Sequence, residues 1–564
     1  MSKKIQILRS KFKKHNIDGY IVPKNDDYFT EYSNINRLKI ISNFSGSAGI
    51  AIILKNKNYL FTDGRYTIQS QLESGKDFKI TNYDEIINCK LFKNLVLGID
   101  PKLFTYNQII KFFKKNNKIK FINKNLIDEI ESKKNINNFQ FFSLNKNIVG
   151  ESSSSKINKI SSYLKKKKSD YLFISAPENV AWILNIRGKD GPNSPIPNSR
   201  LIISKSKKVF LISKIQKVKK IIKEKIINSN ELIDINDFPK KIQKLKGNNF
   251  IIDEKSCSIY FEDIISSKFR ISKREDPTYL LKAVKNRIEM KNMINTHILD
   301  GVALTKFIYW IKNINNKKIT EVQAQNKLES FRKLNKAYLY PSFDTIAGSG
   351  ANGAIVHYKA NKKNCKTIKK KDIFLCDSGG QYKYGTTDVT RTICFSKPKP
   401  YIKDIFTKVL KGHIAVANTN LKKDNIGKKI DIRARKFLKK SNLDYAHGTG
   451  HGVGFFLNVH EGPHAISKYN EVKIQEGMIL SNEPGYYKKD NFGIRIENLV
   501  FVKKTNKNIF FENLTLVPIE KELINYKILT SLEKDYLFKY HLNVYSKISK
   551  HLNLKERKWL ASFI

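Results

Sequence analysis

The stretch from Asp377 to Glu497 constrains this chain more than any other part of its sequence. Four acidic residues and one histidine lie there near predicted strand ends, namely Asp377, Asp388, His451, Glu483 and Glu497. An oxygen-rich set with a single imidazole suits Mn²⁺, and also Zn²⁺, Co²⁺ or Fe²⁺, better than it suits metals that prefer thiolates. Four carboxylates exceed what one divalent ion needs. If they converge, they predict two metal ions about 3.5–4 Å apart with bridging carboxylates.

The sequence around each acidic residue supports this prediction. Asp377 ends the apolar run DIFLC, where an unpaired charge would be costly, and the turn-rich SGGQYKYGTT leads on to Asp388. Antiparallel pairing across that connection would bring the two carboxylates to neighbouring positions. The segment GIRIENLVFV is expected to be one strand, with Arg495 and Glu497 on the same face. Each acid alone is compatible with a solvated surface position, but the five residues as a set favour metal.

Histidines accompany the acidic residues. His447 and His451 lie in HGTGHGVG, whose glycines disfavour a helix and therefore the HExxH arrangement of a single-zinc protease. These glycines would let the backbone pass close to a crowded site. His357 in GAIVHY and His460 in NVHEGP lie on apolar segments. Such a histidine is usually a satisfied core residue, but beside a metal it becomes a candidate for oxyanion stabilisation or proton transfer.

Composition sets broad limits on the class of protein. The chain has 564 residues, enough for about three domains, and 40% of them are hydrophobic. A net charge of +54 on its own suggests polyanion binding, but the lysines are scattered along the chain, so specific nucleic-acid binding is not expected. Five cysteines without CxxC spacing fit a reducing compartment. No apolar run is long enough for a bilayer, so a soluble, cytoplasmic protein without membrane partners is predicted.

A weak internal repeat predicts how the chain is divided. DGYIVP, AGIAIIL and YLFTD are echoed by SDYLFIS, SRLIIS and VFLIS, so that Asp18 corresponds to Asp170 and Leu54 to Ser204. The small, polar GESSSSK is a plausible linker between the two copies. We expect two related α/β domains and then a third unit that carries the chemistry. Its first long helical segment is expected to be interrupted near Gly301.

With these residues in view, the chain resembles the Xaa-Pro aminopeptidase (aminopeptidase P) family, in its long three-domain form. The shared motifs are DGRY, GANGAIVHY, DSGGQYKYGTTDVTRT, VLKGHIAV, HGTGHGVGFFLNVHEGP, NEPGYY and FGIRIEN. The resemblance implies an α/β (α+β) architecture in which two creatinase-like domains, residues 1–150 and 151–275, precede a catalytic domain. That domain, residues 276–564, would have the pita-bread fold of peptidase family M24 with a C-terminal extension.

The resemblance also implies roles for the site residues. Asp377 would hold one metal, Asp388 and Glu497 would bridge, and His451 with Glu483 would complete the second metal. The implied catalytic residues are His357, His447, His460 and Glu483. The implied substrate-binding residues are Arg65, His357, His460 and Arg495, with Arg65 of DGRY reaching toward the bound peptide. Two divalent ions, Mn²⁺ by expectation with Zn²⁺ or Co²⁺ as alternatives, would be the cofactors.

The reaction implied by the resemblance is release of the N-terminal residue from peptides with proline at the second position, through a hydroxide that bridges two divalent metals. A homodimer formed through the third domain is also implied. Three alternatives remain. A prolidase would cleave only Xaa-Pro dipeptides, and the two leading domains argue against it. A methionine aminopeptidase needs little beyond the catalytic unit, and a polyanion- or histone-binding scaffold would not need five intact ligands.

Overall fold

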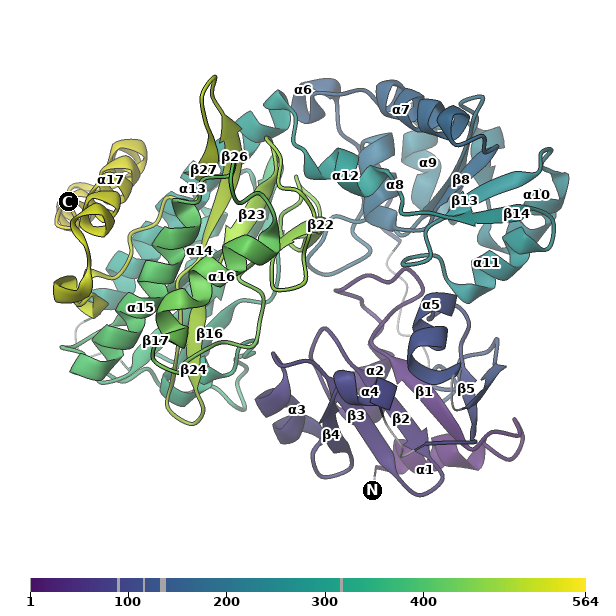
Figure 1. Ribbon diagram of the computed structural model, residues 1–564, viewed down its shortest axis with the longest axis horizontal. Helices are drawn as coiled ribbons and strands as arrows, with labels where there is room; N and C mark the ends of the chain where they lie inside the picture. The colour runs from purple at the N-terminus through teal and green to yellow at the C-terminus, as the bar shows by residue number, and fades with distance from the viewer. Residues whose placement is uncertain (1, 89–91, 115–116, 132–137, 315–317) are drawn as a thin grey trace. The chain divides into compact units, whose positions relative to one another are not determined.

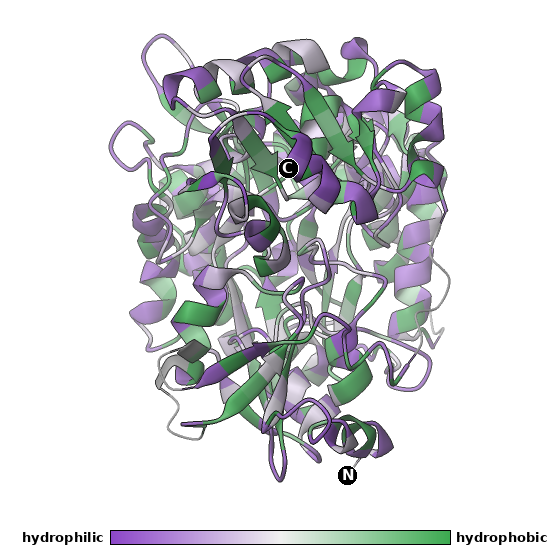
Figure 2. Ribbon diagram, turned by 90° about the vertical axis from the view of Figure 1, so that its right-hand side faces the viewer, coloured by the Kyte–Doolittle hydropathy of each residue, from purple (hydrophilic) through white to green (hydrophobic). Residues whose placement is uncertain are grey.

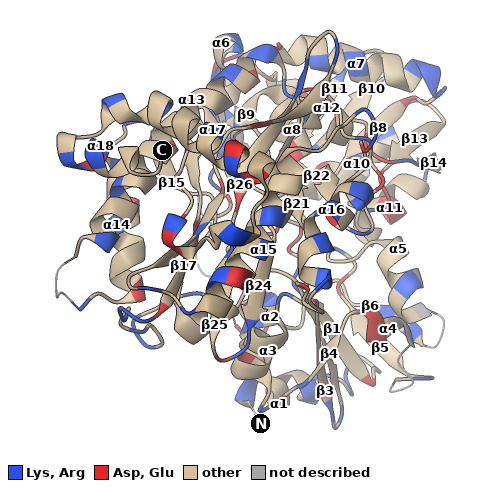
Figure 3. Ribbon diagram, turned by 60° about the vertical axis from the view of Figure 1, so that its left-hand side comes forward, with Lys and Arg blue, Asp and Glu red and all other residues tan. Residues whose placement is uncertain are grey.

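The computed structural model describes residues 2–88, 92–114, 117–131, 138–314 and 318–564. The chain forms two compact units, Met1–Tyr279 and Leu280–Ile564 (Figure 1). Hydrophobic residues concentrate on the strands of both units, whereas hydrophilic ones prevail in the loops (Figure 2). Lysines and arginines lie on helices and loops throughout both units (Figure 3), in agreement with the scattered pattern in the sequence.

The first unit begins with a six-stranded sheet of order β4-β3-β2-β1-β5-β6. Its strands are β1 (Gly19–Pro23), β2 (Ile50–Leu54), β3 (Asn58–Thr62), β4 (Lys79–Asn82), β5 (Val96–Ile99) and β6 (Lys118–Phe121). The helices are α1 (Lys3–Ser10), α2 (Arg37–Ser42), α3 (Thr67–Ser74), α4 (Asp84–Asn88) and α5 (Tyr106–Ile109), the last continued by a π-helical turn, Ile110–Lys114. Apolar clusters cover both faces of this sheet, since Tyr20 and Ile53 belong to one and Ile21 and Ile52 to the other.

A second six-stranded sheet in the same unit has the order β12-β11-β10-β8-β13-β14. Its strands are β8 (Tyr171–Ile174), β10 (Arg200–Ser204), β11 (Val209–Ile212), β12 (Leu232–Ile233), β13 (Asn249–Ile252) and β14 (Arg270–Lys273). Beside it lie the short pair β7 (Phe142–Ser143) and β9 (Ile186–Arg187), and the helices α6 (Lys146–Val149), α7 (Ser153–Lys166), α8 (Pro177–Leu184), α9 (Ile215–Lys223), α10 (Phe238–Lys244) and α11 (Ile259–Ser266). Two 3₁₀ turns occupy Ser229–Glu231 and Ile235–Asp237, and α12 (Thr278–Ala283) spans the division between the units.

The two sheets repeat one topology. In each, the central strand pairs antiparallel with the next long strand and parallel with a later one, and Leu54 lies opposite Gly19 as Ser204 lies opposite Tyr171. The internal repeat predicted from the sequence is therefore confirmed in strand order and register.

The repeat includes an ion pair that occurs once in each sheet, and we call each of these two pairs an aspartate anchor. Asp18 precedes β1, accepts a hydrogen bond from the Lys55 ammonium (2.7 Å) and another from the Val96 amide (2.9 Å). Asp170 precedes β8 and accepts from Lys205 (2.7 Å) and from the amides that open β13. Each carboxylate thereby ties the start of a central strand to both of its neighbours.

The second unit contains antiparallel sheets packed with helices. Its three-stranded sheet β16-β17-β20 and five-stranded sheet β22-β21-β23-β26-β27 are accompanied by the sheets β15-β18-β19 and β24-β25. The strands are β15 (Tyr338–Pro341), β16 (Ile346–Ser349), β17 (Ile373–Ser378), β18 (Gly380–Tyr382), β19 (Gly385–Thr386), β20 (Val389–Cys394), β21 (Gly450–Gly452), β22 (Glu461–Ile466), β23 (Ile479–Asn482), β24 (Gly485–Lys488), β25 (Phe492–Arg495), β26 (Asn498–Lys504) and β27 (Ile509–Asn513).

Helices of the second unit cover these sheets. They are α13 (Arg287–Lys312), α14 (Glu321–Lys333), α15 (Pro400–Ala417), α16 (Gly427–Lys439), α17 (Ser531–Ile548) and α18 (Leu554–Ala561), with 3₁₀ turns at Gly350–Ala354, Lys521–Leu523, Tyr526–Ile528 and Ser549–His551. One apolar cluster joins α13 and α14 to β17 and β20, and another joins α15 and α16 to β23 and β26. A further cluster contains residues of α15, α17, α18 and β25. The strands that carry the acidic residues are therefore held from several sides.

The predicted interruption of the long helix near Gly301 is wrong. Helix α13 runs unbroken through this residue, and its N-cap is Asn286, whose side chain accepts hydrogen bonds from the amides of Ile288 and Glu289. A Cβ at Gly301 would lie 2.5 Å from the carbonyl oxygen of Leu516. Glycine at this position allows a later segment to pack against the helix.

The prediction of one strand over GIRIENLVFV is also wrong. β25 ends at Arg495 and pairs with β24, whereas β26 begins at Asn498 and pairs with β23. Between them, the Glu497 amide donates to the Thr390 carbonyl (3.2 Å). The chain thus changes sheets at the residue that carries the last predicted ligand.

Candidate metal centre

Asp377 and Asp388 are brought together by the pairing of β17 with β20. The strands are antiparallel, with Asp377 opposite Thr390 and Ser378 opposite Val389, which confirms the pairing predicted across the turn. Asp377 lies on β17 and Asp388 immediately precedes β20. Both residues are buried, with 7% and 4% of their surface exposed. Two carboxylates buried side by side require neutralisation by protons or by cations.

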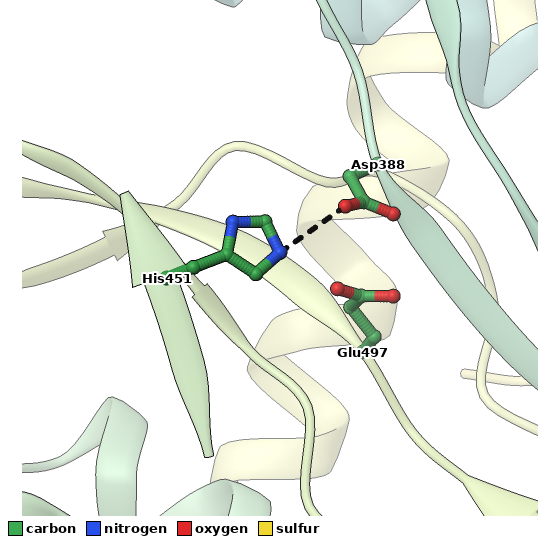
Figure 4. A group of neighbouring side chains, drawn as sticks. All are labelled: Asp388, His451 and Glu497. Atoms are coloured by element: carbon green, nitrogen blue, oxygen red, sulfur yellow. Dashed lines mark ion pairs between the residues drawn. The ribbon is translucent and has the colours of Figure 1, made fainter. Parts of the chain in front are cut away.

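His451, on β21, and Glu497, between β25 and β26, reach the same place. Ligand atoms of Asp388, His451 and Glu497 all lie within 4.8 Å of one another (Figure 4). His451 Nε2 is 3.4 Å from Asp388 Oδ2 and 3.6 Å from Glu483 Oε1. Its Nδ1–H donates to the Gly452 carbonyl (2.9 Å), so Nε2 is the nitrogen directed toward the acidic residues.

The glycines beside His451 permit this placement. The short strand β21 lies between β22 and β23, and a Cβ at Gly450 would stand 1.9 Å from the Ser481 carbonyl oxygen. A Cβ at Gly452 would stand 2.2 Å from the Glu461 carbonyl oxygen. Only a residue without a side chain fits at either position, which agrees with the role predicted for the glycines.

Asp377 and Glu483 complete the group of five. Asp377 Oδ2 accepts a hydrogen bond from Arg495 (2.5 Å), whereas its Oδ1 is buried without a hydrogen-bond partner among the described residues. Glu483 Oε1 accepts from the Ser481 hydroxyl (3.2 Å). A buried carboxylate oxygen that accepts no hydrogen bond is available to bind a cation. The donor set, four carboxylates and one imidazole, fits two hard or borderline divalent cations.

Crowding of these charges shifts their pKa values. Burial raises the pKa of Asp377 to about 7, with Arg495 opposing and Asp388 and Glu483 reinforcing the change. Burial followed by repulsion from Asp388 and Glu483 raises the pKa of Glu497 well above its usual range. For Glu483 burial raises the pKa, but the charges of His451 and Arg495 hold the pKa below its ordinary value. Burial lowers the pKa of His451, but hydrogen bonding to Asp388 and the charges of Glu483 and Asp388 together outweigh it and bring the value to about 9.

These shifts predict how the metal-free protein responds to pH. The raised pKa values of Asp377 (about 7) and His451 (about 9) mean that the folded state holds protons that the unfolded state has released. The stabilisation from protonated His451 is complete below the ordinary histidine value of 6.5 and is lost as the pH rises through 9, and that from Asp377 fades toward 7. We expect the melting temperature of chelated protein to fall between pH 6.5 and 9.

Metal ions replace those protons, so metal-loaded protein should keep its melting temperature over the same range. The measurement is a thermal melt of chelated and Mn²⁺-supplemented protein across this pH window. A gap between the two melting temperatures that narrows with rising pH would contradict the prediction.

Around the acidic residues, Arg495 organises a set of polar contacts. Besides Asp377, its guanidinium donates to the Thr390 hydroxyl (3.0 Å) and to Tyr487 Oη (2.5 Å), and Thr390 in turn donates to Glu497 Oε2 (2.7 Å). Thr390 and Tyr487 were not predicted from the sequence. Both residues lie within motifs noted in the sequence, TDVTRT and NEPGYY. Neither motif by itself indicates that its threonine or tyrosine makes hydrogen bonds beside the candidate ligands.

His447 lies at the end of the same chain of contacts. Its Nδ1–H donates to the Gly448 carbonyl (2.7 Å), which leaves Nε2 to accept from Tyr487 Oη (2.8 Å). Burial lowers its pKa to about 4, so the ring is neutral near pH 7. Its Nδ1 is 4.0 Å from Glu483 Oε2. His447 therefore borders the centre as a neutral imidazole.

The remaining predicted residues lie in different settings. The ring of His460 packs edge-on against that of His451, with centroids 4.3 Å apart. His357 occupies a turn after the 3₁₀ segment Gly350–Ala354 and is half-buried. Arg65 belongs to the first unit, where its guanidinium pairs with both carboxylate oxygens of Asp63 (2.9 and 2.8 Å). The substrate roles of these residues, and of Arg495, stay predictions.

In the part of the chain that the structure describes, no helix combines the length and apolar character needed to span a membrane.

Comparison with protein families gives matches along nearly the whole chain. Residues 291–504 match metallopeptidase family M24, and residues 508–562 match the C-terminal region of peptidase M24. Residues 4–130 and residues 132–289 each match a creatinase/prolidase N-terminal domain. The predicted architecture of two creatinase-like domains before an M24 catalytic domain is thereby confirmed.

Full-length relatives and solved structures agree with these matches. Xaa-Pro aminopeptidase 1 of Dictyostelium discoideum is 36% identical over 608 aligned residues, which cover 100% of this chain and 96% of that protein. The X-prolyl aminopeptidase of Caenorhabditis elegans, described as a cytosolic enzyme with a di-nuclear active site, superposes with a TM-score of 0.92 at 29% identity and covers 100% of this chain and 99% of its own. A prolidase from Pyrococcus furiosus, 25% identical with a TM-score of 0.51, covers 98% of its own chain but 63% of this one.

Proposed function

This chain belongs to the Xaa-Pro aminopeptidases of metallopeptidase family M24, and from that membership we propose that it is a metal-dependent aminopeptidase that releases the N-terminal residue from peptides with proline at the second position. The observation that carries the proposal is the convergence of Asp388, His451 and Glu497 within 4.8 Å, beside the unpartnered Oδ1 of Asp377. An isolated surface patch would not bury these groups together.

Two divalent cations would be held by the five predicted ligands. Asp377 would bind one ion, Asp388 and Glu497 would bridge, and His451 and Glu483 would bind the other. We propose Mn²⁺ as the native metal, because oxygen ligands outnumber the single nitrogen. When bound, the ions would polarise the scissile carbonyl and lower the pKa of water at the site.

The protein's own groups would then handle protons and orientation. Glu483, whose pKa is kept low by its cationic neighbours, is ionised at neutral pH and is proposed as the proton acceptor. His357 and His460 are proposed to stabilise the oxyanion and orient the peptide, and His447, neutral and fixed by Tyr487, to line the substrate side. A proline at the second position makes the scissile bond a tertiary amide without an N–H, so recognition of this bond cannot use that donor.

The extent of the match favours an aminopeptidase over a prolidase. The Caenorhabditis elegans structure covers the whole of this chain, whereas the Pyrococcus furiosus prolidase leaves more than a third of it unmatched. This chain itself matches two creatinase/prolidase N-terminal domains. We therefore propose longer peptides, and not only dipeptides, as substrates.

Three further features belong to this proposal. They are assembly as a homodimer through the catalytic domain, residence in the cytosol as described for the nematode enzyme, and contact of Arg65 with the bound peptide. The division into domains at residues 150 and 275 is proposed with them.

Chelation and metal addition test the function directly. We expect chelated protein to lose activity toward an Xaa-Pro tripeptide or longer peptide and to regain it with Mn²⁺, because the proposed reaction uses water whose pKa is lowered by the metal ions. A peptide of the same length with alanine in place of proline controls for specificity, and an Xaa-Pro dipeptide distinguishes a prolidase. The variant His451→Ala should stay inactive after metal addition. Release of the N-terminal residue at the wild-type rate by this variant would reject the site.

A further inference from the structure

Arg391 is an arginine buried directly behind the metal centre. It lies on β20, three residues after Asp388, and only 2% of its surface is exposed. Its guanidinium donates to six oxygens, all neutral: the carbonyls of Thr390, Glu497, Val517 and Pro518, the side-chain oxygen of Asn498, and Tyr540 Oη. All five N–H groups are therefore satisfied without a carboxylate partner.

These contacts connect two regions that are distant in sequence. On one side are the carbonyl oxygens of Thr390 (2.8 Å) and Glu497 (2.6 Å), which belong to the site and to the turn where the chain changes sheets. On the other side are Val517 (2.8 Å) and the hydroxyl of Tyr540 (2.9 Å). Tyr540 lies on α17, in the segment that matches the C-terminal region of peptidase M24.

Tyr540 completes the hydrogen-bond network around Arg391. Its ring is buried, its oxygen accepts from Arg391, and its own O–H donates to the Val517 carbonyl (2.7 Å). The same carbonyl also accepts from Arg391, so guanidinium, phenol and main chain form a closed triangle. The same guanidinium nitrogen donates to Tyr540, Val517 and Asn498, so the tyrosine hydroxyl restrains the direction of the guanidinium and does not merely satisfy one N–H group.

The geometry points to a role for the C-terminal extension in the metal centre: we propose that Tyr540 and Arg391 are positioning residues that fix the Glu497 turn and thereby the placement of the Glu497 carboxylate. Neither residue contacts the metal position. Helix α17 acts through the fixed guanidinium on the main chain of Glu497, while Thr390, whose carbonyl is held by the same guanidinium, presents its hydroxyl to the Glu497 side chain. This inference rests on the proposed metal binding at Glu497.

The test compares two tyrosines on one helix. Tyr540→Phe removes the hydroxyl that holds Arg391. Tyr536→Phe removes a hydroxyl one turn earlier, which accepts from Asn513 (3.0 Å) and whose ring stacks against that of Tyr540. Calorimetric titration of chelated protein with Mn²⁺ gives the metal affinity, thermal melts of the metal-free proteins give stability, and steady-state kinetics with an Xaa-Pro peptide at saturating Mn²⁺ separate kcat from KM.

We expect Tyr540→Phe to bind Mn²⁺ about tenfold more weakly than the wild type. We also expect a decrease in kcat by a similar factor, with KM unchanged. A tenfold effect is the lower end of what residues that hold metal ligands in place contribute. Tyr536→Phe should match the wild type in both. Equal Mn²⁺ affinity in all three proteins, or equal weakening in both variants, would overturn the positioning role. Wild-type protein that binds no divalent cation would overturn the proposed function, and this inference with it. Arg391→Lys, which keeps the charge but loses the fork of donors, should weaken Mn²⁺ binding further than Tyr540→Phe.

Discussion

Replacing Glu497 by glutamine is expected to lower kcat/KM for an Xaa-Pro peptide by at least about 10³-fold, while the metal-free protein stays as stable as the wild type. The loss of activity follows because an amide cannot bridge two cations as a carboxylate does, and metal assistance contributes several kcal/mol to such a reaction. The unchanged stability follows from the pKa of Glu497, which burial and its anionic neighbours raise well above the usual range. Without metal, burial and the neighbouring anions therefore favour the protonated, neutral form of this side chain.

The measurement pairs steady-state kinetics with thermal melts in chelator and in Mn²⁺. Wild-type protein should gain stability on metal addition, by the linkage between binding and folding, whereas Glu497→Gln should gain little. Asp424→Asn, in the same unit but engaged in an exposed ion pair with Arg433, is the matched control and should keep full activity. A marked fall in the melting temperature of metal-free Glu497→Gln would show that Glu497 is charged before metal binds, and would contradict the argument.

Replacing Arg495 by methionine is expected to destabilise the metal-free protein by about 3–5 kcal/mol, as the removal of one partner from a buried ion pair does. Arg495 is 2% exposed, and its guanidinium supplies the hydrogen bond to Asp377 at 2.5 Å. For a unit of this size the corresponding fall in melting temperature is roughly 10 °C. The loss should grow above pH 7, because Asp377 then has to ionise without its partner.

A double-mutant cycle separates this charge effect from lost packing. Asp377→Asn combined with Arg495→Met leaves no uncompensated carboxylate, so the double variant should be more stable than Arg495→Met alone. Bound Mn²⁺ should also restore part of the stability of Arg495→Met, since a cation takes over the role of the guanidinium. Additive losses in the cycle would mean that the two side chains act independently.

The approach of several candidate ligands to one another was predictable because these residues leave a local trace in the sequence. Asp377 ends an apolar run and Asp388 follows a turn of suitable length, so their pairing follows from strand geometry alone. The glycines around His451 signal close backbone approach, and the contact of Gly450 with the Ser481 carbonyl is such an approach. The repeated strand order of the first unit was also predictable from the sequence. The apolar segments of the two copies follow one another in the same order and at similar spacing.

What could not be predicted depends on residues far apart in the chain. A glycine that ends a helix and one that admits a distant segment look the same in sequence, and the partner of Gly301, Leu516, lies far downstream. Apolar residues recur at strand-like spacing from Ile494 to Val502, although the chain changes sheets between β25 and β26. Because both strands are buried, this pattern does not reveal the change of sheet. Thr390 and Arg391 gain their roles only through contacts with residues more than a hundred positions later.

The aspartate anchors give the first unit a common weakness toward acid. The hydrogen bond from Lys55 lowers the pKa of Asp18, and Lys205 with the β13 amides does the same for Asp170 against the opposing effect of burial. Both anchors contribute while ionised and stop contributing as the pH falls through these lowered values. The two sheets of the first unit have the same ion pair at the same position. Acid therefore removes this stabilisation from both sheets, and neither sheet compensates for its loss in the other.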